Sequence, residues 1–209
     1  MDKIICIGKN YLDHAKELGD AVPEMPILFL KPESCLVVAE KNGMILQLPY
    51  PHGRGSLHHE CEIVVRLFKG GSDLSLEEAE MSFDEVSLGL DMTLRDLQAT
   101  SKKNGHPWET SKVFSGAATA GPFIPRDNFK NFETAEFSLT LDGEAKQKGV
   151  ATQMRLSIAE CISYASRFFR LCPGDLVFTG TPAGVGPVKV GSIAKLQYAD
   201  KINYSVKWI

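Results

Sequence analysis

The sequence has no run of about 18 apolar residues, the length that a helix needs to cross a membrane. It begins MDKIICIGKNY, without the long apolar region and the small-residue cleavage site of a secretory signal peptide. Its five cysteines are an odd number and include no Cys-x-x-Cys pair, which argues against a disulfide framework or a zinc site. These absences predict a cytoplasmic protein with reduced thiols and no membrane partner.

The sequence also has little net charge and no long basic run. Its 23 Lys and Arg against 26 Asp and Glu give a formal charge of −3, which argues against a nucleic-acid partner. Internal repeats, low-complexity segments and Pro/Ser-rich linkers are absent as well. We therefore expect one domain over residues 1–209.

Short strand-like runs outnumber helical segments. We expect strands at residues 3–7, 27–32, 34–39, 57–65 and 86–91, a hairpin turning at Asp142-Gly143, and three strands after residue 174. Capping boxes at Ser75/Glu78 and Ser157/Glu160 predict helix starts, and further helices are expected at residues 10–19 and 93–105. Because these elements do not follow a strict βαβ order, they predict an α+β, mainly β domain.

The stretch LHHECEIVV, residues 57–65, places Glu60 and Glu62 on the same side of an expected strand. With a third oxygen ligand, such as Asp91 at the end of the next strand, the two carboxylates would suit a hard cation such as Mg²⁺. Plainer interpretations stay open: a solvated strand face for the glutamates and a helix cap for Asp91. His58 and His59 are further candidate ligands, although a structural role also accounts for both.

His14 and Glu17 lie three residues apart on an expected helix, so the carboxylate can orient the imidazole. This is the arrangement of a general base that activates water. An exposed amphipathic helix explains the same pair, and the pair alone does not exclude it.

Two further features are weaker signals. The stretch GTPAGVGP, residues 180–187, lacks the Lys-Ser/Thr ending of a phosphate loop, so its glycines indicate a turn at a close approach of the backbone rather than a nucleotide site. Lys112, in TSKVF, is a lone lysine in an expected mildly polar strand, and nothing local singles it out.

Six stretches, in this order, resemble the fumarylacetoacetate hydrolase family, and most closely its short single-domain members, the acylpyruvate hydrolases and the oxaloacetate decarboxylases or tautomerases. They are IICIGKNYLDHAKELG, ILFLKPESCL, HHECEIVV, LGLDMTLRDLQ, PWETSKVFSGAATAGPF and DLVFTGTPAGVGPV. Together they span nearly the whole chain, so the resemblance is far more specific than any one motif.

The resemblance implies a mixed β-sheet roll or sandwich with peripheral helices, usually a homodimer, and a Mg²⁺ or Mn²⁺ ion held by Glu60, Glu62 and Asp91. It implies that residues 8–20 form a mobile lid helix carrying the catalytic pair His14 and Glu17. The other residues that it implicates are catalytic Lys112 and substrate-binding Arg95, Gln98 and Thr181. Lys31, in LKP, matches without an assigned role.

The activity implied first is hydrolysis of a carbon–carbon bond in an acylpyruvate-type 1,3-dicarbonyl acid, giving pyruvate and a carboxylic acid. The ion would act as a Lewis acid, His14 would activate water, and Lys112 would help to stabilise the enolate product. Oxaloacetate decarboxylation or keto–enol tautomerisation at the same site is the main alternative. An alternative of another class is a homologue that binds metal and ligand without catalysis.

Overall fold

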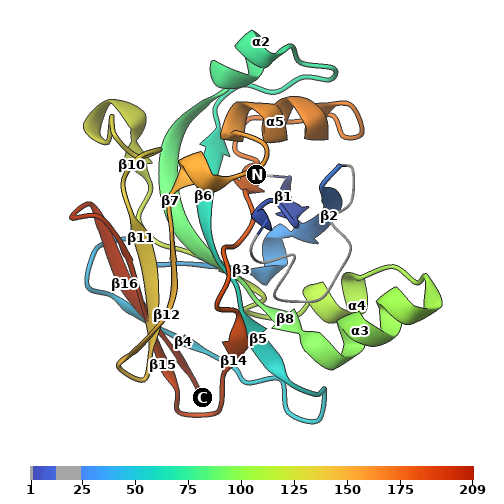
Figure 1. Ribbon diagram of the computed structural model, residues 1–209, viewed down its shortest axis with the longest axis vertical. Coiled ribbons are helices and arrows are strands. Elements are labelled where there is room, and N and C mark those ends of the chain that lie inside the picture. The colour runs from blue at the N-terminus through green and yellow to red at the C-terminus, as the bar shows by residue number, and fades with distance from the viewer. Residues whose placement is uncertain (1, 13–24) are drawn as a thin grey trace.

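Three β-sheets form the framework of the part of the chain that this computed structural model describes, residues 2–12 and 25–209 (Figure 1). The large sheet has the order β2 (Ile27–Pro32), β1 (Lys3–Gly8), β13 (Leu176–Phe178), β6 (Cys61–Leu67), β7 (Phe83–Asp91), β9 (Ala118–Ala120) and β3 (Leu36–Val38), with β10 (Ile124–Pro125) also on β7. The second has the order β12 (Glu144–Gly149), β11 (Phe137–Leu141), β15 (Ile193–Tyr198), β16 (Ile202–Trp208) and β4 (Ile45–Leu48). The third is β14 (Gly186–Pro187), β5 (Leu57–His59) and β8 (Thr93–Leu94).

Most of the strand predictions are confirmed, although β3 starts only at Leu36, because Glu33–Cys35 form a short 3₁₀ helix, and other segments differ as well. The hairpin turns at Asp142 and Gly143, which both have positive φ, 52° and 86°, as a tight primed turn requires. The tail after residue 174 forms four strands instead of three, because Gly186–Pro187 pairs briefly with β5. The single strand expected over residues 57–65 is interrupted at Glu60, where β5 ends and β6 begins.

This interruption marks a change of sheet. Two adjacent strands leave the large sheet together: β6 continues backward into β5, and β7 continues forward into β8. The ladder is bridged at that point by a hydrogen bond from Asp91 N to Glu60 O, 2.9 Å. Side chains at a bend of this kind converge on one space, which places Glu60 and Asp91 together.

The helices are few and short. Both capping boxes are confirmed, at the starts of α2 (Leu76–Glu80) and α5 (Ile158–Ser166). α3 (Arg95–Asn104) ends at Gly105, whose φ of 68° supplies the left-handed C-cap. The strand expected around Lys112 is wrong: this residue ends a one-turn helix, α4 (Glu109–Lys112), because the short polar segment closes a helical turn on Trp108. None of the described helices is both long and apolar enough to cross a membrane.

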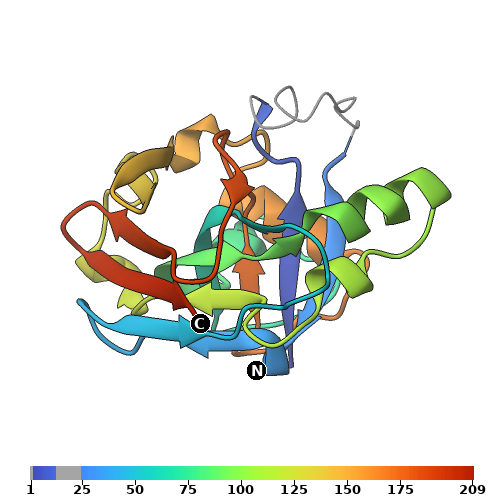
Figure 2. The ribbon, with the colours of Figure 1, turned by 90° about the horizontal axis from the view of Figure 1, so that it is seen from below.

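The five-stranded sheet and the helices α3 and α4 lie on opposite sides of the large sheet in two perpendicular views (Figures 1 and 2). A continuous apolar core joins the sheets, and its largest buried side chains include Trp208, Tyr198 and Tyr204 of the five-stranded sheet. The mainly β architecture with a few peripheral helices agrees with the sequence prediction.

Candidate active site

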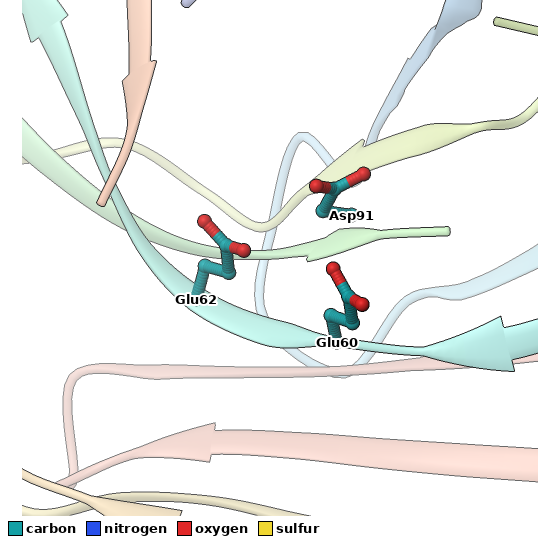
Figure 3. Close-up of side chains that lie close together, drawn as sticks. All are labelled: Glu60, Glu62 and Asp91. Atoms are coloured by element: carbon teal, nitrogen blue, oxygen red, sulfur yellow. The ribbon is translucent and has the colours of Figure 1, made fainter. Parts of the chain in front are cut away.

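Three carboxylates converge where β6 and β7 leave the large sheet (Figure 3). Glu60, Glu62 and Asp91 each offer an oxygen within 4.8 Å of the others, and all three residues are buried. Glu60 and Glu62 lie on the same side of their segment, as the alternation of side chains predicts, and Asp91 joins them from the end of the neighbouring strand. The open interpretation of a solvated strand face is therefore wrong for this pair.

Three buried or half-buried cations surround the carboxylates. Lys112 Nζ lies 2.8 Å from both Glu60 Oε2 and Asp91 Oδ2. Arg95 Nη2 lies 2.6 Å from Glu60 Oε1, and Lys31 Nζ lies 2.7 Å from Asp91 Oδ1. Lys31 also donates to the carbonyl oxygens of Met92, 3.2 Å, and Ala117, 2.7 Å. Lys31 thus has a structural role that the sequence did not indicate: it forms an ion pair with Asp91 while it is anchored to two backbone carbonyl groups.

The surroundings of the cluster raise the pKa of both Glu62 and Lys112, for different physical reasons. Burial raises the pKa of Glu62, and the nearby charges of Asp91 and Glu60 raise it further, against a hydrogen bond of 2.8 Å from Gly180 N–H. For Lys112, burial alone would lower the pKa, but Asp91 and Glu60 outweigh it and hold the pKa above its usual value. As an ammonium group, Lys112 donates hydrogen bonds to both Glu60 and Asp91.

The donor set fits a hard divalent cation. Carboxylate oxygens are the ligands that Mg²⁺ and Mn²⁺ prefer. Among the described residues none donates a well-angled hydrogen bond to the buried Asp91 Oδ1, although Lys31 lies beside it. A cation among the three carboxylates would relieve the repulsion that raises the pKa of Glu62. His58 and His59 do not join the cluster: their ring nitrogens contact Ser56 and Gln147.

A pocket opens onto these carboxylates. Its lining includes all seven of the described residues to which the family resemblance assigns a role in metal binding, catalysis or substrate binding, and six others; the full set is Ile7, Gly8, Lys9, Phe29, Glu60, Glu62, Asp91, Arg95, Gln98, Lys102, Trp108, Lys112 and Thr181. His14 and Glu17, with most of the expected lid helix, lie outside the described residues. The fold therefore brings together residues that lie far apart in the sequence.

The helix side of the pocket contains residues that the sequence analysis missed. Arg95, Gln98 and Lys102 follow the spacing of one helical face, so the periodicity of α3 could have identified Lys102. Arg95 Nη1 donates to Gln98 Oε1 at 2.6 Å, which orients both side chains. Trp108 lies four residues before Lys112, but its place in the pocket could be inferred only if α4 had been recognised as a helix.

Thr181 lies opposite, in the glycine-rich stretch after β13. Its hydroxyl donates to Cys61 O at 2.8 Å and accepts from Gln147 Nε2 at 2.7 Å. The expected close approach of the backbone is also present: Gly184 has a φ of +95°, and a Cβ there would lie 1.9 Å from Lys146 O. Another strand, β12, therefore explains this glycine.

Known proteins are similar to this chain over nearly its whole length. Residues 3–208 match the family model described as "Fumarylacetoacetate (FAA) hydrolase C-terminal". The chain is 39% identical over 192 residues to the oxaloacetate tautomerase YcgM of Escherichia coli, covering 91% of this chain and 85% of that protein. It is also 39% identical over 193 residues to a mitochondrial oxaloacetate decarboxylase of Dictyostelium discoideum, covering 92% of this chain and 87% of that protein.

A solved structure is similar over the whole chain. The fumarylpyruvate hydrolase of Pseudomonas aeruginosa, in complex with Mn²⁺ and pyruvate, superposes with a TM-score of 0.92 at 40% identity, covering 100% of this chain and 91% of that one. The predicted fold class is thereby confirmed. The relatives are enzymes named for small keto acids, and they include tautomerases, a decarboxylase and a hydrolase.

Proposed function

Because the chain belongs to the fumarylacetoacetate hydrolase family, we propose that it is a divalent-metal-dependent enzyme acting on a small 2-oxo acid with two carboxylates. The activity that we propose first is keto–enol tautomerisation of oxaloacetate. The sequence alone favoured acylpyruvate hydrolysis, and the relatives named for oxaloacetate shift the preference.

The proposed ion is Mg²⁺ or Mn²⁺, held by Glu60, Glu62 and Asp91, the described cluster of three carboxylates. When bound, the ion would supply Lewis-acid polarisation of a substrate carbonyl. The pyruvate and Mn²⁺ in the related Pseudomonas enzyme support both the kind of ion and the kind of ligand.

The charge balance of the buried cluster is the observation that carries the choice of a dianionic substrate. With all three carboxylates ionised, Glu60, Glu62 and Asp91 carry −3, and their ion-pair partners Lys31, Arg95 and Lys112 carry +3. A divalent ion would leave this buried cluster at +2. Since buried charge is costly without a partner, a dicarboxylate balances the site better than a monocarboxylate.

The residues of the pocket have distinct proposed roles. The Lys112 ammonium group lines the pocket beside the carboxylates and is placed to donate to a substrate oxygen on which negative charge develops. Arg95, oriented by Gln98, is placed to bind a carboxylate, for which its planar fork of N–H donors is suited. Tautomerisation moves a proton between carbon and oxygen, so it needs a group that exchanges a proton with the substrate carbon but no activated water.

Hydrolysis of an acylpyruvate-type acid is the second candidate. It requires a base for water, and the sequence offers His14 oriented by Glu17. The similarity to the Pseudomonas fumarylpyruvate hydrolase favours it specifically. Decarboxylation of oxaloacetate would use the same site as tautomerisation.

A parallel assay distinguishes these activities. The protein would be incubated separately with oxaloacetate and with acetylpyruvate in the presence of Mg²⁺ or Mn²⁺. Enol absorbance and pyruvate release would be measured, and EDTA would give the metal-free control. We expect EDTA-sensitive equilibration of the oxaloacetate enol without stoichiometric pyruvate. Pyruvate from oxaloacetate would indicate a decarboxylase, and cleavage of acetylpyruvate would indicate a hydrolase. No reaction with either substrate would favour a non-catalytic homologue.

A variant of the proposed base separates hydrolysis from decarboxylation. His14→Ala should cripple acetylpyruvate hydrolysis but spare much of any metal-driven decarboxylation, which needs no activated water. Equal loss of both activities would count against a water-activating role for His14.

A homodimer and a cytoplasmic location remain predictions. Several relatives are named as mitochondrial proteins, so the comparisons do not favour the cytoplasm. Sedimentation of the purified protein would test the homodimer, and microscopy of a tagged chain would test the location.

A further inference from the structure

Gln147 is a buried amide on an edge strand whose neighbouring side chains face solvent. It belongs to β12, at the edge of the five-stranded sheet, and is 2% exposed, whereas Lys146 and Lys148 on either side are exposed. None of the strands of that sheet contributes a residue to the described pocket lining. Gln147 is nevertheless in direct contact with the segments that form the pocket.

All the hydrogen-bonding groups of the Gln147 amide are used. Its Oε1 accepts from Cys61 N–H at 3.0 Å and lies 2.9 Å from His59 Nδ1. Its Nε2 donates to Thr181 Oγ1 at 2.7 Å and to Pro182 O at 2.9 Å. Because a backbone N–H can only donate, the contact with Cys61 fixes which end of the amide is the oxygen.

These contacts connect the segment that carries Glu60 and Glu62 to the segment that carries Thr181. Cys61 lies between the proposed metal ligands Glu60 and Glu62, at the point where the chain changes sheets. Thr181 lines the pocket, and its own hydroxyl donates to Cys61 O. Cys61, Thr181 and Gln147 thus form a closed triangle of hydrogen bonds. Without the Gln147 amide, the hydroxyl of Thr181 would lose one of the two contacts that fix its direction.

The local backbone is shaped to bring Gln147 into this position. In the pairing of β11 with β12, Leu139 pairs with Gln147, but the next residue of β11 pairs with Ala145. Lys146 is therefore an extra, bulged residue of β12. A bulge re-aims the neighbouring side chains. The bulged Lys146 carbonyl is also the group against which Gly184 packs so closely that a Cβ would not fit.

We propose that Gln147 is a positioning residue for the active site: it fixes Thr181 against the backbone between Glu60 and Glu62. The five-stranded sheet would thereby act on a pocket that it does not line. The effect of a Gln147 substitution on turnover rests on the proposed function. Its effect on the backbone around Thr181 does not.

The expected effect is on substrate handling more than on metal binding. Glu60, Glu62 and Asp91 each keep a hydrogen bond or ion pair that does not involve Gln147. Thr181, by contrast, depends on Gln147 directly. We therefore expect the variant Gln147→Met to lower kcat/KM by about 10- to 100-fold, the range seen when supporting residues are removed, with a much smaller change in Mn²⁺ affinity.

The experiment is a double-mutant cycle on the full-length protein, combining Gln147→Met with Thr181→Val. Gln147→Glu is a second variant that keeps the acceptor toward Cys61 but has no amide donor for Thr181. Gln197→Met, an exposed glutamine of the same sheet, is the matched control. Kinetics, Mn²⁺ titration and backbone hydrogen exchange of residues 179–188 would be measured for each folded variant.

We expect faster exchange of residues 179–188 in Gln147→Met and Gln147→Glu but not in Gln197→Met, and kinetic losses in the double variant smaller than the sum of the single losses. Unchanged exchange in both Gln147 variants, or additive losses, would overturn the proposal. If exchange rises while the wild-type protein turns over no 2-oxo acid, the positioning of Thr181 stands and the proposed function falls.

Discussion

The two sides of the pocket differ in charge, burial and origin. The strand side, from β6 and β7, contributes Glu60, Glu62 and Asp91, all buried. The helix side, from α3 and α4, contributes the cations Arg95, Lys102 and Lys112. Backbone hydrogen bonds between paired strands hold the strand side in place, whereas the helix side is formed by side chains that extend from short helices.

This division separates two tasks. Ion binding requires carboxylates held close together against their mutual repulsion, and paired strands at a change of sheet provide the rigid backbone for this. Recognition of an anionic substrate requires cations on the facing wall, and longer side chains on helices can supply them. The comparison predicts that changes on the strand side abolish activity through the ion and that changes on the helix side alter rate or specificity.

The largest effect is expected from Asp91→Asn. Removing a residue that supports a metal ligand lowers metal affinity by up to about 100-fold, and removing a ligand itself should lower it at least as much. Turnover should be lost together with the metal. Metal titration and the oxaloacetate assay measure this, with Asp84→Asn, an exposed aspartate on the same strand, as control. Full activity of Asp91→Asn would disprove the metal role of the strand side.

Lys112→Met should give the next largest effect. Removal of a donor at a developing negative charge costs about 100- to 1,000-fold in kcat, whereas metal affinity should not fall because the variant removes a positive charge beside the ion. Parallel kinetics and metal titration check this. Loss of metal binding together with turnover would show that the two sides of the pocket are not separable.

The pH dependence of stability should differ between the metal-free and metal-loaded protein. Because the pKa of Glu62 is raised by burial and by its neighbours, its protonated form is the one that the metal-free fold favours. This contribution to stability is present below the ordinary carboxylate pKa of about 4.3 and is lost as pH rises through the raised pKa. We therefore expect the gain in Tm on adding Mn²⁺ to increase with pH; a gain that is independent of pH would contradict this electrostatic description.

The smallest effect is expected from Lys102→Met on the helix side. Lys102 lines the pocket, so its loss should raise the KM for a dicarboxylate by about tenfold or less, the range expected for one ordinary hydrogen bond, and change the KM for a monocarboxylate less. Lys103→Met, exposed on the same helix, is the control. Equal effects on both substrates would remove Lys102 from substrate selection.

The two sides of the pocket also differed in how far the sequence revealed them. The Glu-x-Glu spacing in a strand put two carboxylates on one side by alternation alone, and both were found so placed. On the helix side, Lys112 was expected in a strand, and Lys102 and Trp108 were not singled out. Periodicity is a weak guide there, because α4 is only a single turn.

By itself, the sequence determined the local structure: the capping boxes, the Asp142-Gly143 turn and the alternation around Glu62, all of which depend on neighbours a few residues away. Only the tertiary structure decided that Asp91 and Lys112 meet Glu60, that Lys31 supports Asp91, and that Gln147 reaches the pocket from another sheet. These contacts join residues that lie at least 21 positions apart in the sequence. Which of these residues meet depends on how the strands pair around the change of sheet at Glu60. Strand pairing between distant segments cannot be read from a local sequence pattern.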